Sequence, residues 1–504
     1  MSETSHNLEL SILELPAIVT HLFERAQRPL LSGASDPLGL FVRYLRRKPG
    51  RGLAVIYSIG EPGTPVALRK VQAGDPHRAV SLALAESALE GAHIRFTTSQ
   101  AQEAPLAVQP TGVVQVETLG ISVQAFPADN GLPALAASCD TAHNGPLFPA
   151  LEAAAQTFLH NQEWRLVDAS AEPVRYKPAS RCVIRYRLTL EHATGGTPTR
   201  RKLTLFGKVY AEPEQARAIQ ATMQRIYTEQ TQAGMSTLPR PLGTVEALGL
   251  TINEAIQPPE LEEGAGTQAV LRTGLRALQP RLVQGRGGEI TGIVTPDEEL
   301  RLTAVALARL HTSAVRSEGA PRTGAKEAKR ARERAALIAA HNPAQAAEVQ
   351  RLAQQLAERL KHTQPDAYRP AHGGFKASQL LFHSQHVFIV DFDGFCLADP
   401  ALDVGYFLAY LRPSGLWYQR AGMRQWFEAA ASIFITTYRQ AMLERGIDPA
   451  IVDGILQRTR LYEAALLFKI ATRRANRLNS PRPKELSAML TEIAVCLSND
   501  VRRE

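Results

Sequence analysis

The sequence contains few cysteines, and their positions exclude two kinds of site. Four occur in 504 residues, at Cys139, Cys182, Cys396 and Cys496. None belongs to a CxxC pair or lies beside a cluster of histidines, so neither a structural zinc site nor a disulfide framework is indicated. We expect four reduced thiols, most of them buried.

Long apolar runs are also missing. No stretch approaches the roughly 20 consecutive apolar residues with which a helix crosses a bilayer. Residues 1–27 mix acidic and basic residues among apolar ones, without the basic start and continuous apolar segment of a signal peptide. These two absences predict a cytoplasmic protein with no membrane partner.

No segment shows a long run of charge of one sign, although the formal net charge is +8. Basic residues are spread along the chain, and the densest cluster, residues 322–334, is expected to be a loop leading into a solvated helix. We interpret the positive charge first as an ordinary basic surface and second as attraction for anionic substrates such as ATP. A nucleic-acid groove ranks third.

With 504 residues, the chain is long enough for two or three domains. Residues 41–71 and 174–210 each read as strands joined by a turn, and the stretch between them is rich in Pro, Gly and Asn. This composition predicts a domain boundary near residue 150. From about residue 300 onward helical periodicity dominates, interrupted by one β-rich island at 370–395.

The two β-units show weak similarity to each other. Aligning the Lys-Pro pair at 48–49 with the pair at 177–178 brings Tyr57 opposite Tyr186 without a gap. Each unit then ends in a strand that carries a lysine, Lys70 in the first and Lys208 in the second. Either a β-module is duplicated or two basic hairpins look alike by chance, and these short matches do not decide between the two.

The residues that carry chemistry are concentrated in residues 371–411, AHGGFKASQLLFHSQHVFIVDFDGFCLADPALDVGYFLAYL. Asp391 directly follows the apolar residues 388–390. A carboxylate at the end of an apolar strand is held rigidly and directed to solvent, which suits a ligand for Mg²⁺.

This run resembles the active-site run of the aminoglycoside phosphotransferase and choline kinase superfamily. The superfamily pattern is HGDxxxxNxL, then an IDF strand, then GDPxxDLA at the start of a helix. Order and spacing agree over the whole run, and the matching residues are His372-Gly373, Leu380-Leu381, Asp391-Phe392-Asp393, Asp399-Pro400 and Asp403. The resemblance covers roughly residues 160–480. Within it LARLH (307–311) resembles the helix before the catalytic loop, FGKVY (206–210) the lysine-bearing strand and INEAI (252–256) the hinge.

The resemblance implies ATP-dependent transfer to a hydroxyl of a small molecule, with ATP and Mg²⁺ as cofactors. It implies Asp391 and Gln379 as metal ligands, the amide oxygen of Gln379 acting where the pattern has asparagine. Lys208 would pair with the α- and β-phosphates and Lys376 would reach the γ-phosphate. Further residues implied in nucleotide binding are Arg181 and Glu254.

Several matching residues have a structural interpretation. Asp399 and Pro400 are typical of a helix N-cap and first position. Asp403 is expected to anchor hydrogen bonds inside the protein. His372, placed in the catalytic loop, is expected to pack there and orient the backbone rather than carry protons.

Two departures from the pattern bear on activity. Gly374 stands where the pattern has the aspartate that accepts the proton of the acceptor hydroxyl, and glycine has no side chain to do so. Gln220 and Gln224 stand where a kinase offers a glutamate to the lysine. Either the chain is a weak or atypical kinase with another base, for which Asp393 is the candidate, or it is a catalytically silent nucleotide-binding pseudokinase with a regulatory role. A nucleic-acid-associated basic protein is the third hypothesis.

Together these observations predict an α+β protein with the two-lobed, protein kinase-like fold. We expect an extra α+β N-terminal domain at 1–150, which is either a degenerate copy of the small lobe or unrelated to it. The β-rich small lobe is expected at 151–258, and the helical large lobe with the catalytic loop and metal site at 259–504. The expected partners are a nucleotide, a small-molecule acceptor and, through the N-terminal domain, another protein.

Overall fold

The computed structural model consists of antiparallel sheets and many helices, which confirms the expected α+β class. It describes residues 15–27, 39–48, 52–60, 77, 79–90, 93–192, 198–256, 271–284, 290–412, 422–475 and 484–498. The chain divides into two compact units. Unit 1 comprises Met1–Gln220 and Pro241–Ala255, and unit 2 comprises Ala221–Arg240 and Ile256–Glu504.

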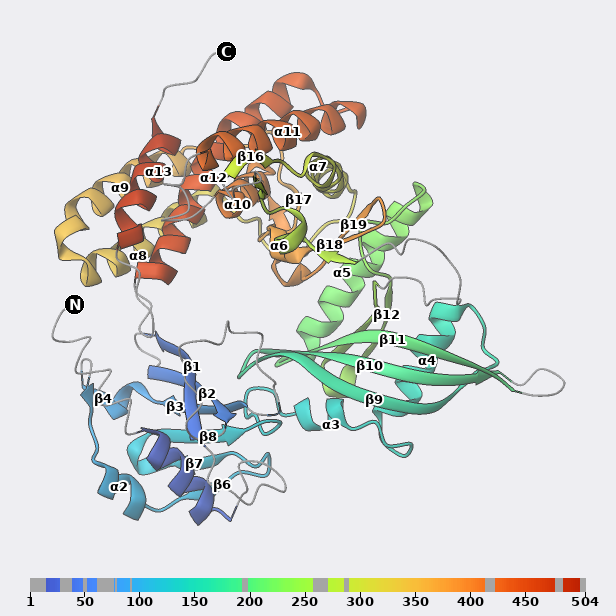
Figure 1. Ribbon diagram of the computed structural model, residues 1–504, viewed down its shortest axis with the longest axis vertical. Helices are drawn as coiled ribbons and strands as arrows, with labels where there is room; N and C mark the ends of the chain where they lie inside the picture. Colours follow the sequence, from blue (N-terminus) through green and yellow to red (C-terminus); the bar gives the residue numbers. More distant parts are fainter. Residues whose placement is uncertain are drawn as a thin grey trace. The chain divides into compact units, whose positions relative to one another are not determined.

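The first sheet of unit 1 has six strands in the spatial order β1-β2-β3-β8-β7-β6 (Figure 1). They are β1 (Gly39–Lys48), β2 (Gly52–Gly60), β3 (Ala79–Leu84), β6 (Ala107–Val108), β7 (Val114–Val116) and β8 (Ile121–Ala125). In β2 the alternate residues Leu53, Val55, Tyr57 and Ile59 are buried. Apolar residues at every second position face one side of a sheet, so this face forms a core.

The second sheet of unit 1 has five strands in the order β12-β13-β11-β10-β9. They are β9 (Trp164–Lys177), β10 (Arg181–His192), β11 (Thr199–Tyr210), β12 (Pro241–Val245) and β13 (Leu250–Glu254). Helix α4 (Leu147–Leu159) packs along one face of this sheet (Figure 1), because alternate residues of β10 are apolar and point toward it.

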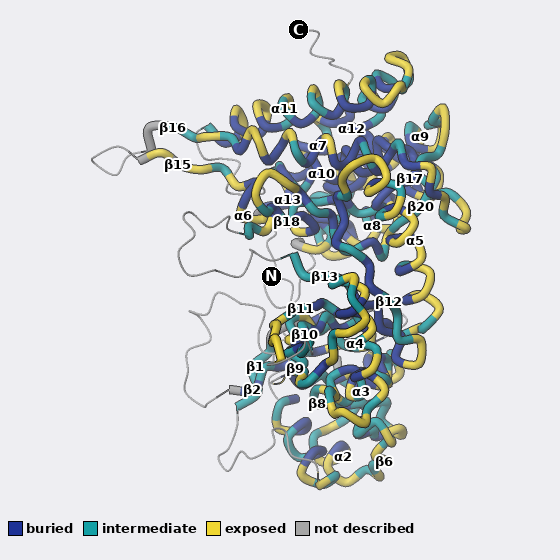
Figure 2. Tube along the Cα trace, turned by 90° about the vertical axis from the view of Figure 1, so that its right-hand side faces the viewer, coloured by how far each residue is buried: buried dark blue, intermediate teal, exposed yellow. Residues whose placement is uncertain are grey.

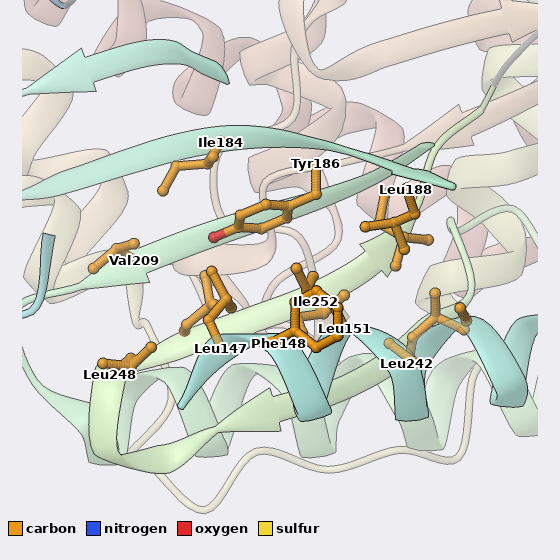
Figure 3. Packing of buried hydrophobic residues seen from close by; sticks show 14 of the residues in the cluster. Leu147, Phe148, Leu151, Ile184, Tyr186, Leu188, Val209, Leu242, Leu248 and Ile252 are labelled. Atoms are coloured by element: carbon orange, nitrogen blue, oxygen red, sulfur yellow. The ribbon is translucent and has the colours of Figure 1, made fainter. Parts of the chain in front are cut away.

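Tyr186 lies at the centre of this core, among leucine, isoleucine and valine side chains from the sheet and α4 (Figure 3). Its hydroxyl donates a hydrogen bond of 2.8 Å to the carbonyl oxygen of Ser138, so the polar end of the buried ring is satisfied. Gly207 makes room for the ring, since a Cβ atom there would lie 2.6 Å from Cε2 of Tyr186. The strand therefore requires glycine one residue before Lys208.

The two sheets share the same strand order over five strands. In the first sheet the neighbouring strands run in the order β1-β2-β3-β8-β7, and in the second sheet the corresponding order is β9-β10-β11-β13-β12. The register also agrees: Tyr57 pairs with Val80 in the first sheet, and Tyr186 pairs with Leu205 in the second. Both tyrosines are fully buried.

The connection between the last two shared strands also repeats. Residues 116–121 read VETLGI and residues 245–250 read VEALGL. Each forms a short 3₁₀ turn that ends at a glycine in the left-handed conformation, Gly120 (φ 63°) or Gly249 (φ 53°). In each sheet the carbonyl oxygen of this glycine accepts a hydrogen bond from a backbone amide at the end of the third strand. Ala85 donates to Gly120 at 2.8 Å, and Tyr210 donates to Gly249 at 2.9 Å.

This register corrects one detail of the sequence alignment. Lys208 lies opposite Thr251 in the second sheet. The residue of the first sheet that corresponds to Thr251 is Ser122, and it lies opposite Ala83, so Ala83 corresponds to Lys208. The third strand of the first sheet is β3, so the pairing of Lys70 with Lys208 is wrong as an alignment of strands. Lys70 itself lies outside the described residues.

Unit 2 is mainly helical from residue 297 onward, as the sequence predicts. Its longer helices are α7 (Asp297–His311), α8 (Gly324–His341), α9 (Ala346–Lys361), α10 (Ala401–Leu411), α11 (Met423–Glu444), α12 (Pro449–Ala475) and α13 (Lys484–Leu497). Helix α10 is buried along almost its whole length and packs on α12, whose middle part, residues 461–468, is also buried (Figure 2). The expected β-rich island is present as β17 (Arg369–Ala371), β18 (Leu380–His383), β19 (His386–Ile389) and β20 (Cys396–Ala398).

Two predictions made from composition can be compared with the structure. All four cysteines are free thiols; Cys182 and Cys496 are buried, and Cys139 and Cys396 are half-buried. Among the described residues no helix is both long and apolar enough to cross a membrane.

Asp129 joins the segment after the first sheet to the turn between β9 and β10. Its carboxylate is buried and accepts hydrogen bonds from the backbone amide of Gly131 (2.8 Å), the hydroxyl of Tyr176 (2.7 Å) and the backbone amide of Ala179 (2.8 Å). Gly131 packs so closely on Ala179 that a Cβ atom would lie 2.4 Å from its Cα atom. The turn before Arg181 is therefore fixed by the preceding segment.

We predict that Asp129→Ala lowers the free energy of unfolding by about 3 kcal/mol, because buried donors lose their acceptor. Urea denaturation would measure the loss. Asp140→Ala is the matched control: Asp140 is exposed and its carboxylate accepts one bond, from the amide of Ala142 at 3.0 Å, so we expect a change of about 0.5 kcal/mol. Equal effects of the two substitutions would show that Asp129 does not fix the turn.

Candidate active site

The expected catalytic loop, residues 372–379, is organised by the carboxylate of Asp403. Asp403 lies in the first turn of α10 and is completely buried. Its oxygens accept hydrogen bonds from the backbone amides of His372 (2.6 Å), Gly373 (3.4 Å) and Phe375 (3.4 Å). The expectation that Asp403 anchors internal hydrogen bonds agrees with this geometry.

His311, the last residue of α7, supports the same carboxylate from the other side. Its Nε2 atom lies 3.5 Å from Oδ2 of Asp403, and its Nδ1 atom lies 2.7 Å from the hydroxyl of Tyr438. Burial by itself would raise the pKa of Asp403, but His311, His372 and the amide of Phe375 favour the charged form and lower the pKa below its usual value. The anchor therefore stays ionised at neutral pH.

The two glycines of the loop have different roles. Gly373 has a positive φ of 73°, and a Cβ atom there would lie 2.0 Å from the carbonyl oxygen of Gly394, so no other residue fits. Gly374 does not have a positive φ, and a Cβ atom there would meet no heavy atom within 4 Å. At position 374, where the superfamily pattern has aspartate, there is therefore room for a side chain.

His372 packs inside the loop, as the sequence predicts. It is buried between the rings of Phe375 and Phe392, and its Nε2 atom donates a hydrogen bond of 3.1 Å to the carbonyl oxygen of Val390. Burial is the largest cause that lowers its pKa, so the neutral ring is favoured. A neutral, buried imidazole connects the loop to the strand before Asp391, which is a positioning role.

The two expected metal ligands lie side by side. Nε2 of Gln379 donates to Oδ2 of Asp391 at 3.4 Å, and the amide oxygen of Gln379 is buried without a hydrogen-bond partner. Asp391 has the left-handed conformation (φ 72°, ψ 55°), which side chains other than glycine adopt at a cost of about 1 kcal/mol. An unsatisfied buried oxygen beside a carboxylate fits a hard cation such as Mg²⁺, which prefers oxygen ligands.

The described residues contain no group of three or more His, Cys, Asp or Glu side chains that would enclose a metal ion. Mg²⁺ is usually bound by one or two carboxylates together with phosphate oxygens and water. The other two predicted residues of this region flank the pair. Lys376 begins the 3₁₀ turn that ends at Gln379, with its Nζ atom 5.3 Å from the ring centre of Tyr410, and Asp393 lies two residues after Asp391.

Three predicted nucleotide-binding residues lie in unit 1. Lys208 on β11 is opposite Val183 on β10, and Arg181 is opposite Tyr210, so Lys208 and Arg181 share one face of the sheet. Nζ of Lys208 lies 5.1 Å from the ring centre of Tyr210. Glu254 pairs with a fully buried leucine of β11 and lies on the opposite face.

Gln220 is one of the two glutamines predicted to stand where a kinase has the glutamate that pairs with its lysine. It is buried on α5 (Pro213–Gln232), and its Nε2 atom donates a hydrogen bond of 3.0 Å to the carbonyl oxygen of Ile252. Its amide oxygen has no hydrogen-bond partner. Gln224 is exposed and bonds Thr228 on the same helix, so of the two glutamines Gln220 is the one directed to the sheet.

The sequence did not reveal the role of Arg322. Its Nη1 atom donates to the carbonyl oxygen of Gly373 at 2.6 Å, and its Nε atom donates to buried Glu327 at 2.7 Å. Burial would raise the pKa of Glu327, but Arg322 and Arg330 lower it to about 2. The loop and the helix predicted for residues 322–334 are present, but Arg322 in that loop is largely buried and binds the catalytic loop.

Asp399 also has a structural role, as expected. It is fully buried and forms two hydrogen bonds with Arg458, of 2.7 Å and 3.2 Å. Its Oδ1 atom also accepts from the amide of Ala401 at 3.1 Å, so it caps α10 although the helix begins one residue later than expected. No sequence signal points to Arg458, which is far from Asp399 along the chain.

Comparison with known proteins supplies the family. Residues 198–441 match the model of the phosphotransferase enzyme family. No curated protein matches the chain.

Several solved structures are similar to the chain. A glucosamine kinase shares 15% identity and a TM-score of 0.41, with 98% of this chain and 98% of that chain covered. A choline/ethanolamine kinase family protein from Mesorhizobium loti shares 13% identity and a TM-score of 0.37, covering 62% of this chain and 85% of that chain. An amicoumacin kinase in complex with AMP-PNP and Ca²⁺ shares 14% identity and a TM-score of 0.37, covering 64% and 87%.

The family resemblance drawn from residues 371–411 is therefore confirmed, since the matched region contains this whole run. Residues 198–441, slightly less than half of the chain, are similar to the phosphotransferase enzyme family.

Proposed function

We propose that this protein transfers the γ-phosphoryl group of ATP to a hydroxyl of a small molecule, at a low rate, with Mg²⁺ bound by Asp391 and Gln379. The observation that carries the proposal is the unsatisfied, buried amide oxygen of Gln379 beside the Asp391 carboxylate. Both residues adjoin a loop whose backbone Asp403 holds in place. The match of residues 198–441 to the phosphotransferase enzyme family supports the same reaction.

Each residue has a proposed task in this reaction. Lys208 and Arg181 bind nucleotide phosphates, and Lys376 approaches the transferred group. The acceptor oxygen forms its bond to the γ-phosphorus while the bond from that phosphorus to the β–γ bridging oxygen breaks, and ADP leaves. When bound, Mg²⁺ neutralises phosphate charge, which is a large part of what phosphoryl transfer needs.

The proton of the acceptor hydroxyl lacks its usual base, because Gly374 has no side chain. Positioned general-base catalysis contributes about 10²–10⁴ in rate, so turnover is low unless Asp393 or water accepts the proton. The open space at Gly374 also favours a second candidate function, a nucleotide-binding pseudokinase that is catalytically silent. Binding of Mg·ATP is common to both candidates, and only turnover distinguishes them.

We further propose that the first sheet of unit 1 is a second copy of the β11-containing sheet. The shared strand order, register and the VETLGI/VEALGL turn support this. In the first copy Ala83 stands at the place of Lys208, so it lacks the phosphate-binding lysine. A copy without this lysine is suited to a regulatory or protein-binding role.

Mg·ATP should stabilise the protein, because it binds the folded state only. At a ligand concentration a hundredfold above its dissociation constant, we expect a gain of about 2.7 kcal/mol. Thermal unfolding with and without Mg·ATP measures it. An unchanged melting temperature at millimolar Mg·ATP, with no heat of binding by calorimetry, would refute both candidate functions.

Asp391→Asn should weaken Mg²⁺-dependent ATP binding at least about tenfold while leaving the fold intact. Asparagine adopts the left-handed conformation as readily as aspartate, so the backbone is preserved and only the charge is lost. Isothermal titration with Mg·ATP and circular dichroism measure the two effects. Asp453→Asn, which removes one partner of an exposed ion pair with Arg439, is the control and should bind normally. Loss of folded protein in Asp391→Asn would instead make Asp391 a structural residue.

Gly374→Asp should raise the slow hydrolysis of ATP by at least about tenfold, a modest part of the general-base contribution. The site has room for the new side chain and does not require a positive φ. Gly374→Asn is the matched control, since it has the same shape without the basic carboxylate. A flat rate with lower stability would mean that the loop does not accept a side chain. If the wild-type protein already transfers phosphate at ordinary rates and the substitution slows it, the base lies elsewhere and Asp393 becomes the leading candidate.

A further inference from the structure

Cationic side chains gather beside the catalytic loop, where α8 packs on α12. Lys469 and Arg473 lie one turn apart on α12, and Arg330 and Arg334 lie one turn apart on α8. Arg334 reaches across to α12, where its Nη1 atom donates to the carbonyl oxygen of Ala465, one turn before Lys469. These four side chains, with Arg322 and Lys376, are called here the basic subsite.

Tyr406 connects the basic subsite to the catalytic loop. The Nζ atom of Lys469 lies 5.4 Å from its ring centre, and the Cζ atom of Arg322 lies 5.2 Å from the same ring. Arg322 also donates to the hydroxyl of Tyr406 at 2.5 Å and to the carbonyl oxygen of Gly373 at 2.6 Å. Three successive contacts, through Tyr406 and Arg322, therefore connect Lys469 to Gly373, the residue that precedes Gly374.

Negative charge in the protein compensates only part of this cluster. Glu327 is buried and pairs with Arg322 (2.7 Å) and Arg330 (2.6 Å). Within the described part of the chain no ion pair involves Arg334, Lys469 or Arg473. Burial, followed by the positive charges of Arg473, Arg334, Arg322 and Lys376, lowers the pKa of Lys469 to about 7.

A half-buried lysine among other cations is costly in free energy unless an anion neutralises it. Titratable groups with strongly shifted pKa values are enriched at functional sites. The cluster lies on the same unit as Gly374, Asp391 and Gln379 and contacts the loop itself. An anion bound here would therefore lie in the same unit as the loop and be connected to it through Tyr406 and Arg322.

We infer that the basic subsite, centred on Lys469, Arg473 and Arg334, binds an anionic group of the acceptor. The acceptor would be a small alcohol that already carries a phosphate or a carboxylate. This inference rests on the proposed function, since it assigns the substrate class of the same active site. It gives the positive charge of residues 322–334 a role in substrate recognition.

The test measures anion binding separately from nucleotide binding. Thermal unfolding of the full chain is followed with inorganic phosphate, with acetate, and with chloride at equal ionic strength, each in the presence of saturating Mg·AMP-PNP to occupy the nucleotide site. We expect phosphate or acetate to raise the melting temperature where chloride does not. Stronger binding of phosphate indicates a phosphorylated acceptor, and stronger binding of acetate indicates a carboxylate.

Variants locate the binding. Lys469→Met keeps the apolar stem and should weaken the anion about tenfold, the worth of one charge-assisted hydrogen bond. Arg473→Met should have a similar effect and is exposed, so it keeps the test valid if Lys469→Met does not fold. Lys361→Met, at the exposed end of α9, is the matched control and should bind as the wild type does.

Two results would overturn the inference. One is that neither phosphate nor acetate stabilises the protein beyond chloride. The other is that Arg473→Met and Lys361→Met bind the anion equally well, which would mean that binding does not involve the basic subsite. Failure of Mg·AMP-PNP to bind at all, detected by its own titration, would instead refute the proposed function and leave anion binding to be judged alone.

Discussion

The hydrogen bonds that the Asp403 carboxylate accepts from the catalytic loop are the constraint on which the site depends. They fix three backbone amides between His372 and Phe375, and the carboxylate stays charged because His311 and His372 favour its ionised form. The position of Asp403 in turn depends on the start of α10, which the buried Asp399–Arg458 pair holds. Breaking one member of a buried ion pair commonly costs about 3–5 kcal/mol, so this frame tolerates little change. The frame of a phosphotransferase loop is thus maintained although Gly374 removes the side chain that the frame usually presents.

The sequence predicted well those features that are carried by short, local patterns. The run 371–411 located the loop, the Gln379–Asp391 pair and the Asp403 anchor, because these residues lie close together along the chain. The alignment of Tyr57 with Tyr186 also agrees with the strand registers. Lys70 was matched with Lys208 only because each lies near the end of a strand-like segment, whereas the strand registers place Ala83 at the position of Lys208.

What the sequence missed depends on contacts between distant segments. Arg322 looked like the first member of a solvated basic cluster, and only the fold shows that it donates to Gly373 and that Glu327 neutralises it. Arg458 pairs with Asp399 across 59 positions of the chain. A run of charged residues does not reveal which of its members are buried, since burial depends on the helix that packs against them. For the same reason no sequence motif predicts that Lys469 lies close to the basic residues of α8.

The open space at Gly374 has an evolutionary consequence. Two of the four glycine codons, GGU and GGC, become aspartate codons by a single nucleotide change, so with either of them position 374 is one mutational step from a carboxylate. At Gly373 the carbonyl oxygen of Gly394 blocks the Cβ position, so no substitution there preserves the loop. Two adjacent glycines thus differ in the constraint on them: the backbone requires glycine at position 373, whereas position 374 has room for a side chain.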